Sequence, residues 1–448
     1  MTSPGGAGSP RFLMCSRAVP WPDRLLQGSF HIEQALGLRS IGAEMELFGA
    51  GFAIPNWLGR RLSRFRDHCS RPLKYRVRGV QIYAPRVRFP FPPVMRHVIA
   101  AAAPRFVDRC AERTKSKALA QTIERSRPDV LLGHGMIPWA STLQRASRDT
   151  GVPHAYIEHS AIDVLRINPG TRLADFYRGT AEQARAVFVV GPQMLEHATE
   201  VLRWPNVHLL PNGARPAIAD VPPRPSKLAG KKIVLAAANY YRRKGFEELV
   251  DALPGALDHH PSLEVHIITD APPSLRRRAE SRIPAGRVHF HDPMLGDELL
   301  HWMHWSDLFV LPSWDEAFGL VYAEALLQGC GVIATEDSGF ARYCTLYESK
   351  YGLRPATTVL PRNTEGLTEA IVSLLEDEDR MRWEREAGRD MVDRWFSWRS
   401  NAITLRDTLF DEPTQVAENE RPEFPPRVES CPNASRASIR SSASPRTR

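Results

Sequence analysis

Short apolar runs alternate with amphipathic stretches along the first half of the chain. The apolar runs are bounded by glycine, proline or polar residues, and they predict strands at residues 11–20, 43–48, 128–135, 152–160, 186–191 and 207–214. Helical spacing predicts helices over residues 31–40 and 142–151. A strand, a glycine-bearing loop, a helix and a second strand form a βαβ unit, so the first half is expected to build a parallel sheet.

A second α/β series begins after residue 231. Residues 215–231, RPAIADVPPRPSKLAGK, are rich in proline and are typical of a linker between domains. Beyond them, strands are predicted at residues 232–238, 263–269, 287–292, 307–313 and 331–335. Helices are predicted after Lys244-Gly245, over residues 323–329, and over residues 365–410 with a break near Trp395. The pattern therefore predicts two α/β domains of similar size.

Length and composition fit this organisation. At 448 residues the chain is too long for a single core and suits two or three domains. Charged residues make up 25% and hydrophobic residues 43%, which excludes a disordered chain, a collagen-like fibre and a small disulfide-stapled protein. No apolar run is long enough to span a bilayer, no signal peptide is apparent, and the six cysteines lack metal-binding spacing. These features predict a cytoplasmic protein with reduced thiols.

The ends of the chain and its charge add two further expectations. Residues 1–10 are predicted to be flexible, and residues 412–448, rich in Pro, Ser, Glu and Arg without periodicity, to form a disordered tail. The net charge is +8, and residues 58–97 alone carry eleven basic side chains against one acid, Asp67. Such a patch indicates an anionic partner, namely a phosphate, a membrane surface or a nucleic acid, unless it is simply a solvated basic face.

The segment richest in candidate chemistry is SDLFVLPSWDEAFGLVYAEALLQGCGVIAT, residues 306–335. A buried strand ends at Pro312-Ser313, a loop carries Glu316, and a helix begins near Gly319. Helix N-termini at the carboxyl ends of parallel strands attract phosphate, so backbone N–H groups here are expected to face an anionic ligand. The groups concerned belong to Ala317, Phe318, Gly319 and Leu320. The carboxylates of Glu316 and Glu324 suit recognition of sugar hydroxyls, because each accepts at least two hydrogen bonds.

Glu316-x7-Glu324 within this segment resembles the signature of the retaining glycosyltransferases of family 4, also called glycosyltransferase group 1. Four other blocks resemble the same family, namely GVPHAYIEHS (151–160), LLPNGA (209–214), RRKGFEELVDAL (242–253) and VHFHDPMLGDELLHWMHWSDLFVLPS (288–313). The resemblance runs from about residue 12 to residue 410. It implies the GT-B fold, in which two Rossmann-like α/β domains with parallel sheets face each other across a cleft.

The resemblance also implies a division of the chain. An N-terminal acceptor domain is expected at residues 11–215, a linker at 216–231, and a C-terminal donor domain for the nucleotide sugar at 232–395. Residues 396–411, which begin at Phe396, are expected to form a helix that crosses back onto the first domain.

The resemblance assigns a role to individual residues. Lys244 matches the basic residue that neutralises the donor diphosphate, Glu316 the carboxylate that contacts the transferred sugar, and Glu324 the carboxylate that binds the nucleotide ribose. His159 matches the histidine that faces the donor sugar across the cleft. Gly28 matches the glycine-bearing loop near the phosphates. Catalytic roles are thus implied for His159, Glu316 and Lys244. Donor binding is implied for Gly28, Lys244, Glu316, Glu324 and residues 317–320.

Two positions depart from the family's pattern. Where the family has an arginine five or six residues before the lysine, this chain has Asn239 and Ala238, so Arg242 or Arg243 is expected to take its place in donor binding. The paired glycines of the phosphate loop are reduced to Gly28-Ser29.

The implied chemistry needs no cofactor and no metal. Breaking the bond to a nucleoside diphosphate leaves negative charge on the departing group, which preorganised cations and N–H dipoles stabilise. Lys244, a neighbouring arginine and the helix N-terminus near Gly319 supply both. The family retains the anomeric configuration by attack on the face from which the nucleotide departs, so no protein nucleophile is required.

Four histidines of the second domain are candidate metal ligands. His289 and His291 alternate on one predicted strand, and His301 and His304 lie at i, i+3 of a predicted helix. Zinc needs three or four converging ligands, so the sequence favours no metal site.

The sequence therefore predicts a retaining glycosyltransferase that moves a sugar from a nucleoside diphosphate sugar to a hydroxyl of a glycan, a glycolipid or a small molecule. The alternatives are a GT-B epimerase and a basic nucleic-acid-binding protein. No RNP, KH, helix-turn-helix or zinc-finger pattern accompanies the basic segment, so no nucleic-acid partner is expected. The donor base, the sugar and the acceptor are not specified by the residues.

Residues 57–78 suggest where the protein acts. Apolar and basic side chains alternate there at near-helical spacing: Trp57, Leu58, Leu62 and Phe65 beside Arg60, Arg61, Arg64 and Arg66. Such a stretch can lay its apolar face into lipid headgroups while its arginines meet anionic lipid. It predicts peripheral binding to the inner face of the plasma membrane. A phosphorylated or acidic soluble acceptor is the competing partner for the same cations.

Overall fold

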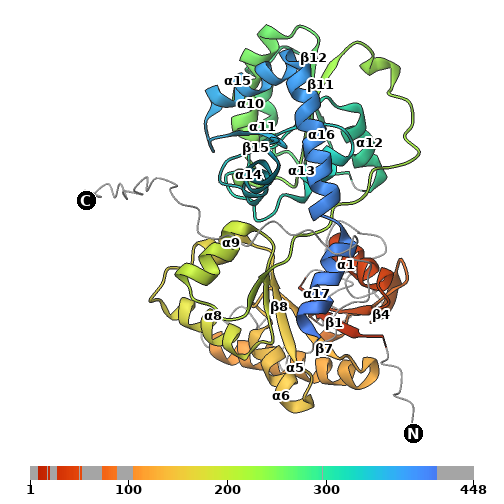
Figure 1. Cartoon of the computed structure of the whole chain (residues 1–448), viewed down its shortest axis with the longest axis vertical. Helices are drawn as coiled ribbons and strands as arrows, with labels where there is room; N and C mark the ends of the chain where they lie inside the picture. The colour runs from red at the N-terminus through yellow and green to blue at the C-terminus, as the bar shows by residue number, and fades with distance from the viewer. Residues whose placement is uncertain are drawn as a thin grey trace.

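The protein consists of two α/β lobes, which lie one above the other in Figure 1. The computed structural model describes residues 9–17, 19–20, 28–49, 51–52, 73–87, 104–294 and 296–410. Most of the predicted membrane-binding segment, residues 57–72, lies outside the described residues, as do residues 1–8 and 411–448. Among the described helices, none combines the length and the apolar character that crossing a bilayer requires.

The N-terminal lobe is built around an eight-stranded sheet in the order β10-β9-β8-β7-β1-β2-β5-β4. Its strands are β1 (Arg11–Cys15), β2 (Glu44–Phe48), β4 (Lys74–Val77), β5 (Val80–Tyr83), β7 (Val130–His134), β8 (His154–Glu158), β9 (Val187–Val189) and β10 (Val207–Leu209). Neighbours pair in parallel except β4, which runs antiparallel to β5. The central strands are buried on both faces, as in sheets that helices cover on both sides. A short pair, β3 (Gly51–Phe52) and β6 (Arg86–Val87), stands apart.

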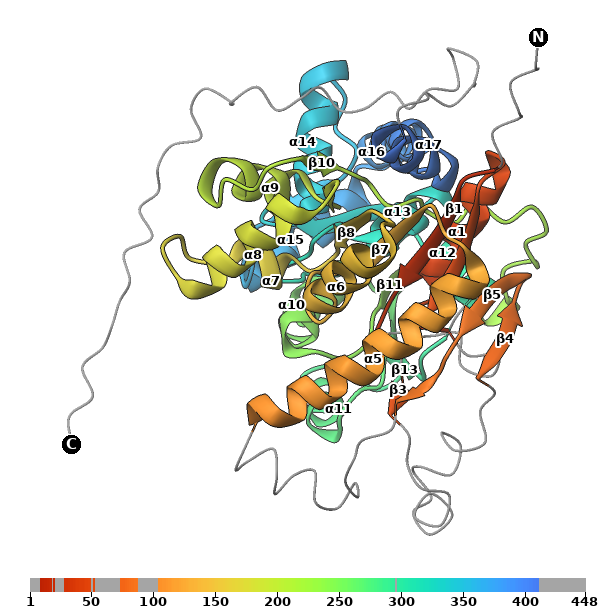
Figure 2. The same ribbon diagram turned by 90° about the horizontal axis from the view of Figure 1, so that it is seen from below.

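Helices cover both faces of this sheet. They are α1 (Ser29–Ser40), α5 (Pro104–Ser126), α6 (Ala140–Thr150), α7 (Ala161–Leu165), α8 (Arg172–Gln183) and α9 (Pro192–Glu196), the last continued by a π-helical turn at His197–Val201. The long helix α5 runs across the lower face of the lobe in Figure 2. Hydrophobic periodicity predicted α1 and α6. The sequence analysis did not predict α5 or the β4–β5 hairpin, and it considered the hairpin residues only for their positive charge.

The C-terminal lobe contains a six-stranded parallel sheet in the order β13-β12-β11-β14-β15-β16. Its strands are β11 (Lys232–Ala237), β12 (Leu263–Ile268), β13 (Val288–His291), β14 (Leu308–Val310), β15 (Gly331–Thr335) and β16 (Thr357–Val359). The chain runs outward from β11 to β13 and then returns to the other side of β11 with β14. Such a reversal opens a crevice at the carboxyl ends of the two adjoining strands, which is where open α/β sheets bind ligands.

The helices of this lobe surround its sheet in the same manner. They are α10 (Phe246–His259), α11 (Pro273–Glu280), α12 (Asp297–Trp305), α13 (Leu320–Leu327), α14 (Gly339–Tyr351), α15 (Thr364–Glu376) and α16 (Glu378–Trp395). Short 3-10 turns lie at Ser226–Leu228 in the connecting segment and at Arg242–Lys244 after β11.

The last helix joins the two lobes. Helix α16 packs on α13 of the second lobe, and α17 (Trp398–Leu409) packs on α1 of the first (Figures 1 and 2). Gln34 Nε2 donates a hydrogen bond to Asn401 Oδ1 at 2.9 Å, and Asn401 Nδ2 donates to the carbonyl oxygen of Pro211 at 2.8 Å. These buried polar contacts fix the position of α17 on the first lobe.

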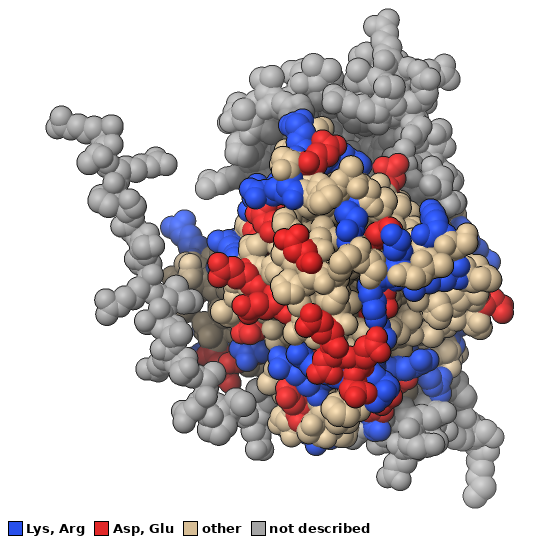
Figure 3. All heavy atoms as spheres, turned by 90° about the horizontal axis from the view of Figure 1, so that it is seen from above, with Lys and Arg blue, Asp and Glu red and all other residues tan. Residues whose placement is uncertain are grey.

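The face of the molecule seen in Figure 3 carries charges of both signs. Lys and Arg side chains are interspersed with Asp and Glu side chains over this face.

A glycine substitution tests the contact between α1 and α17. A Cβ at Gly37 would lie 2.4 Å from the carbonyl oxygen of Trp398. Gly37→Ala is expected to lower the free energy of unfolding by about 1–3 kcal/mol, because an overpacked interface must separate or distort. Gly179→Ala in α8 is the matched control, since nothing lies within 4 Å of its Cβ, and alanine should leave stability unchanged or raise it by up to about 1 kcal/mol. Urea denaturation followed by circular dichroism measures both, and equal effects would contradict the interface.

Candidate functional site

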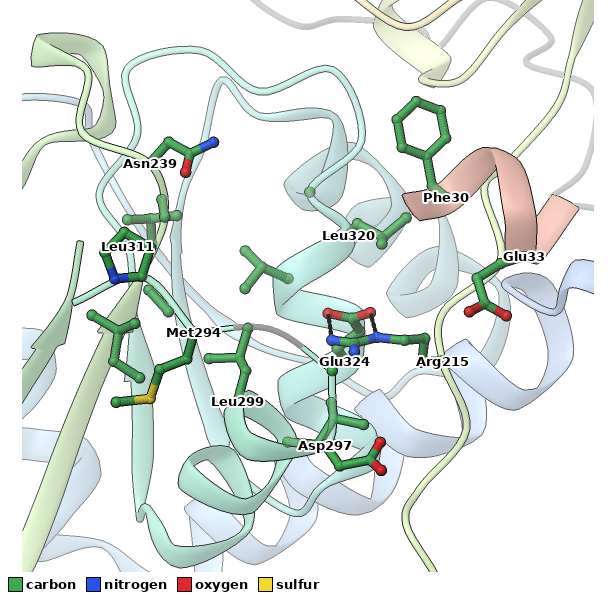
Figure 4. Close-up of a pocket in the computed structure, with 18 of the residues that line it drawn as sticks. Phe30, Glu33, Arg215, Asn239, Met294, Asp297, Leu299, Leu311, Leu320 and Glu324 are labelled. Atoms are coloured by element: carbon green, nitrogen blue, oxygen red, sulfur yellow. Dashed lines mark hydrogen bonds and ion pairs between the residues drawn. The ribbon is translucent and has the colours of Figure 1, made fainter. Parts of the chain in front are cut away.

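A cavity of about 1070 Å³ lies between the lobes, at the carboxyl ends of β11 and β14. Phe30 and Glu33 border it from α1, and in Figure 4 they face Asn239 and Leu311 across the cavity. Residues 215–218 of the connecting segment and residues of the second lobe complete the wall. The cavity therefore occupies the crevice that the reversal of strand order creates, and it is large enough for a nucleotide-sized ligand.

The turn after β11 brings Lys244 to Glu316. The turn ends at Gly245, which has a left-handed φ of 73°, and a Cβ there would lie 2.1 Å from the carbonyl oxygen of Pro312. Glycine thus allows the turn to pack against the end of β14. As a result Lys244 Nζ lies 2.5 Å from Glu316 Oε2, and both side chains line the cavity.

The two arginines of the same turn point in different directions. Arg243 lines the cavity and donates to Asp315 Oδ1 at 2.8 Å. Arg242 is not among the residues that line the cavity. Its guanidinium pairs with Glu248 of α10 at 2.9 Å and lies 4.7 Å from the ring centre of Trp314. Of the two expected substitutes for the missing arginine, the structure places Arg243 at the cavity.

The loop between β14 and α13 is packed tightly against both lobes. A Cβ at Gly191, just before α9 of the first lobe, would lie 2.2 Å from the carbonyl oxygen of Ala317. A Cβ at Gly339, the first residue of α14, would lie 1.9 Å from the same oxygen. Gln193 Nε2 also donates to the carbonyl oxygens of Glu316 and Ala317, each at 3.2 Å. These contacts hold the loop in one place relative to the first lobe.

The first turn of α13 borders the cavity. Gly319 is its N-cap residue with φ 90°, where a Cβ would lie 2.5 Å from the ring of Tyr322. Gly319 and Leu320 line the cavity, whereas the side chains of Ala317 and Phe318 are buried and do not line it. The helix N-terminus carries partial positive charge, so it suits an anionic ligand group here.

Glu324 forms a bidentate ion pair with Arg215. Arg215 Nε lies 2.6 Å from Glu324 Oε1 and Nη2 lies 3.1 Å from Oε2, as Figure 4 shows. Both residues line the cavity, and Glu324 is only 4% exposed. The sequence analysis missed Arg215. The signal that could have found it is a basic residue directly after the LLPNGA block, at the point where the chain passes from one lobe to the other.

His159 lies in an aromatic cluster behind Phe30. The rings of His134 and His159 stack with centroids 4.1 Å apart, and those of His31 and His134 are 4.3 Å apart. Phe30 contacts this cluster, with its centroid 5.2 Å from that of His159. Phe30 lines the cavity, but the three histidines and Gly28 do not. Gly28 is the N-cap of α1, and its carbonyl oxygen accepts a hydrogen bond from His31 Nδ1 at 3.1 Å.

The histidines of this cluster are uncharged near neutral pH. Burial lowers the pKa of His31 to about 4 and that of His159 to about 3. Their Nε2 atoms, like that of His134, are buried and find no hydrogen-bond partner among the described residues. Buried polar atoms without partners are rare in folded proteins, so these three atoms are candidates for hydrogen bonds to a ligand or to a buried water molecule.

Glu158 is a further functional candidate that the sequence analysis missed. It ends β8, directly before His159, and is 3% exposed. Its Oε1 accepts a hydrogen bond from the backbone N–H of Met136 at 2.6 Å. Burial raises the pKa of Glu158 to about 7, and this hydrogen bond opposes the rise only in part. A carboxylate at the end of an otherwise apolar strand was the available signal.

Two family models match the chain, one on each lobe. The model described as a glycosyl transferase 4-like domain matches residues 33–213, and the model described as glycosyl transferases group 1 matches residues 231–377. A D-inositol 3-phosphate glycosyltransferase of Corynebacterium glutamicum is 29% identical over 191 residues, which are 40% of this chain and 43% of that protein. A GDP-mannose-dependent alpha-(1-6)-phosphatidylinositol monomannoside mannosyltransferase of Mycobacterium tuberculosis is 29% identical over 192 residues, 41% of this chain and 48% of that protein. The chain thus spans about half the length of these curated relatives.

Solved structures share the fold at low identity. Sucrose-phosphate synthase of Thermosynechococcus elongatus superposes with a TM-score of 0.65 at 18% identity, over 88% of this chain and 97% of that chain. HepE of Anabaena, solved with UDP and glucose, superposes with a TM-score of 0.63 at 16% identity, over 89% and 99%. The predicted GT-B fold is confirmed by these similarities and by the two parallel sheets.

Glu158 gives stability a pH dependence of known sign. Its folded pKa of about 7 lies above its ordinary value of 4.5, so the folded protein holds the proton more tightly. The stability that Glu158 contributes is therefore fully present below about pH 4.5 and is lost as the pH rises through 7, by about 3 kcal/mol at most. Glu158→Gln, which keeps the acceptor for Met136, should match the wild type at pH 5 and exceed it at pH 8.

Chemical denaturation at both pH values measures this difference. Glu182→Gln, on the exposed side of α8, is the control and should leave the pH dependence as it is. Parallel curves for the wild type and Glu158→Gln would contradict the assignment.

Proposed function

Because the chain belongs to the glycosyl transferases group 1, with the two family models together matching well over half of it, we propose that it is a retaining glycosyltransferase. It moves a sugar from a nucleoside diphosphate sugar to a hydroxyl of a glycan, a glycolipid or a small molecule. The observation that carries this proposal is the set of three cation–carboxylate pairs at the cavity between the lobes. The pairs are Lys244 with Glu316, Arg243 with Asp315, and Arg215 with Glu324.

In this proposal the donor diphosphate binds where Lys244, Arg243 and the first turn of α13 meet. A departing nucleoside diphosphate gains negative charge, and fixed cations and N–H dipoles stabilise that charge in the transition state. Lys244 and Glu316 are each less than one fifth exposed, so their charges act in a partly desolvated space, where they are stronger than in water. In this proposal these groups stabilise the diphosphate charge in place of a metal ion.

Glu316 and Glu324 serve in recognition. A carboxylate oxygen has two lone pairs, so Glu316 can hold Lys244 and still accept a hydrogen bond from a sugar hydroxyl. Glu324 can likewise hold Arg215 and accept from a ribose hydroxyl. Because both carboxylates are already fixed by cations, the donor meets groups that need little reorganisation.

His159 is proposed to meet the transferred sugar from the first lobe. Its uncharged ring can hydrogen-bond a sugar hydroxyl, and its Nε2 has no hydrogen-bond partner among the described residues. Phe30 stands between this ring and the cavity, so the sugar reaches His159 once the Phe30 side chain has turned aside. Rotation of one side chain at a partly exposed position is a small rearrangement compared with lobe closure.

The sugar is proposed to keep its anomeric configuration. Attack by the acceptor on the face from which the nucleotide departs gives retention without a protein nucleophile. The acceptor hydroxyl is expected to approach from the first lobe, where Arg78 and Glu33 form an ion pair on the cavity wall. The cationic residues 57–78 remain our prediction for an anionic membrane surface, at the inner face of the plasma membrane.

Glu324 tests the donor site. Glu324→Gln should weaken binding of the correct nucleotide by about 1–3 kcal/mol, because a charged acceptor for the ribose hydroxyls is lost. Glu386→Gln, on the exposed face of α16, is the control and should bind as the wild type does. Titration calorimetry with UDP-, GDP- and ADP-sugars first identifies the donor and then measures the variants. Unchanged affinity in Glu324→Gln would refute the ribose assignment.

Glu316 and His159 test the transfer step. Glu316→Gln and His159→Ala should reduce turnover about 10²-fold or more while changing nucleotide affinity little, since both are proposed to face the sugar. Initial rates, measured with the donor found by calorimetry, should persist in EDTA. Loss of activity in EDTA that manganese restores would contradict the site. A GT-B epimerase, the alternative, would instead return a nucleotide sugar of altered configuration and release no free nucleoside diphosphate.

A further inference from the structure

Three potential metal ligands converge at the edge of the second sheet, outside the cavity. Glu264 and His266 lie on β12, and His289 lies on the edge strand β13 directly opposite His266. His266 Nε2 is 3.9 Å and His289 Nε2 is 3.7 Å from the same oxygen, Glu264 Oε2. All three atoms lie within 4.8 Å of one another. Alternation along strands puts all three side chains on one face of the sheet.

The ring nitrogens that point into this cluster lack partners. Nε2 of His266 and Nε2 of His289 are both buried, and no described residue hydrogen-bonds to either. His266 is only 3% exposed, so bulk water does not reach it. An unpaired buried polar atom is destabilising, and two that face one carboxylate oxygen need an explanation.

The second ring nitrogen of His266, Nδ1, is already paired and leaves Nε2 without a partner. His266 Nδ1 lies 2.9 Å from His291 Nε2, so one of these two atoms carries the shared proton. When His266 Nδ1 donates, its Nε2 is a bare lone pair directed at a carboxylate oxygen. A cation between these lone pairs would satisfy all of them.

We propose that Glu264, His266 and His289 bind one divalent metal ion, and that their chemistry best suits Zn²⁺. Two imidazoles and one carboxylate are a common set of zinc ligands, with a water molecule in the fourth position. Tetrahedral zinc places its ligand atoms about 3.3 Å apart, so the three atoms need to approach by less than about 1.5 Å. The His289 side chain is 38% exposed, which provides both the freedom to move and a path for the ion.

The surroundings of the cluster resemble the outer contacts of a metal site. Lys231 Nζ lies 3.0 Å from Glu264 Oε1, so one carboxylate oxygen is held by lysine and the other is left for the metal. His291 holds His266 Nδ1, which directs His266 Nε2 inward. The indole of Trp302 covers His266 and His291, with centroids 4.5 and 4.8 Å away. Contacts of this kind orient metal ligands and fix their tautomers.

The role of this ion would be structural. The cluster ties the edge strand β13 to β12, and through Lys231 it reaches the segment that connects the lobes. Ile268, two residues beyond His266 on the same strand, lines the cavity, so the ion would stiffen the strand that forms that wall. The sequence favoured no metal because the four histidines at positions 289, 291, 301 and 304 do not supply three or four converging ligands. Glu264 and His266 become ligands only through the register of the sheet.

Zinc titration of the full-length, untagged chain tests this site. After chelator dialysis, competition with a chromophoric chelator should show one equivalent of Zn²⁺ bound, and Co²⁺ should give the visible bands of a four-coordinate site. His289→Ala removes a partly exposed ligand and should weaken Zn²⁺ binding about 100-fold or more. His304→Ala, an exposed histidine of α12, is the matched control and should bind as the wild type does.

Thermal unfolding separates loss of the site from loss of the fold. Without zinc, His289→Ala and the wild type should unfold at the same temperature, and zinc should raise that temperature in the wild type alone. Binding of less than one equivalent by the wild type, or equal affinity in His289→Ala and His304→Ala, overturns the proposal. If His289→Ala unfolds early without zinc, Glu264→Gln takes its place under the same criteria. Nucleotide binding by the zinc-free protein tests the donor site separately.

Discussion

The carbonyl oxygen of Ala317 is held between two glycines, and the arrangement of the cavity depends on that contact. Gly191 belongs to the first lobe and Gly339 to the second, and any larger residue at either position would push the oxygen aside. Glu316 and Gly319 flank this carbonyl, so its position sets where a carboxylate and a helix N-terminus meet the cavity. Gln193 reinforces the contact from the first lobe. Close backbone packing thus links the distance between the lobes to the geometry of the donor site.

Three carboxylates at the cavity are each matched with a cation. Asp315, Glu316 and Glu324 each lie within 3 Å of a basic nitrogen. A buried charge without a partner is strongly destabilising, so the pairing allows six ionised side chains to share a partly buried wall. An anionic ligand then joins pairs that are already in place. The neutral histidines of the first lobe add hydrogen-bonding atoms on the other side without adding charge.

The sequence predicted the features that depend on residues close together in the chain. Alternating apolar runs predicted strands where β1, β7, β8, β11 and β12 lie, and the Glu316–Glu324 block with its neighbours predicted the GT-B fold. The sequence did not predict the features that depend on contacts between residues far apart in the chain. Arg215 stands in a proline-rich linker, and only the folded chain shows that it reaches Glu324, 109 residues away. His31, on α1, and His134, at the end of β7, were missed for the same reason, since no local sequence pattern links them to His159. Residues 74–83 were considered only for their positive charge, so the β4–β5 hairpin that they form was not predicted.

The hydrogen bond between Gln34 and Asn401 joins residues that are 367 positions apart. Domains usually fold in the order of their synthesis, each closing its own core before the next is made. Here the groove on α1 is filled by α17, which leaves the ribosome only after the whole second lobe. During synthesis, the face of α1 that α17 covers in the folded protein therefore stays uncovered until the chain is nearly complete. The contact between the last helix and the first one therefore forms only after nearly the whole chain has been made.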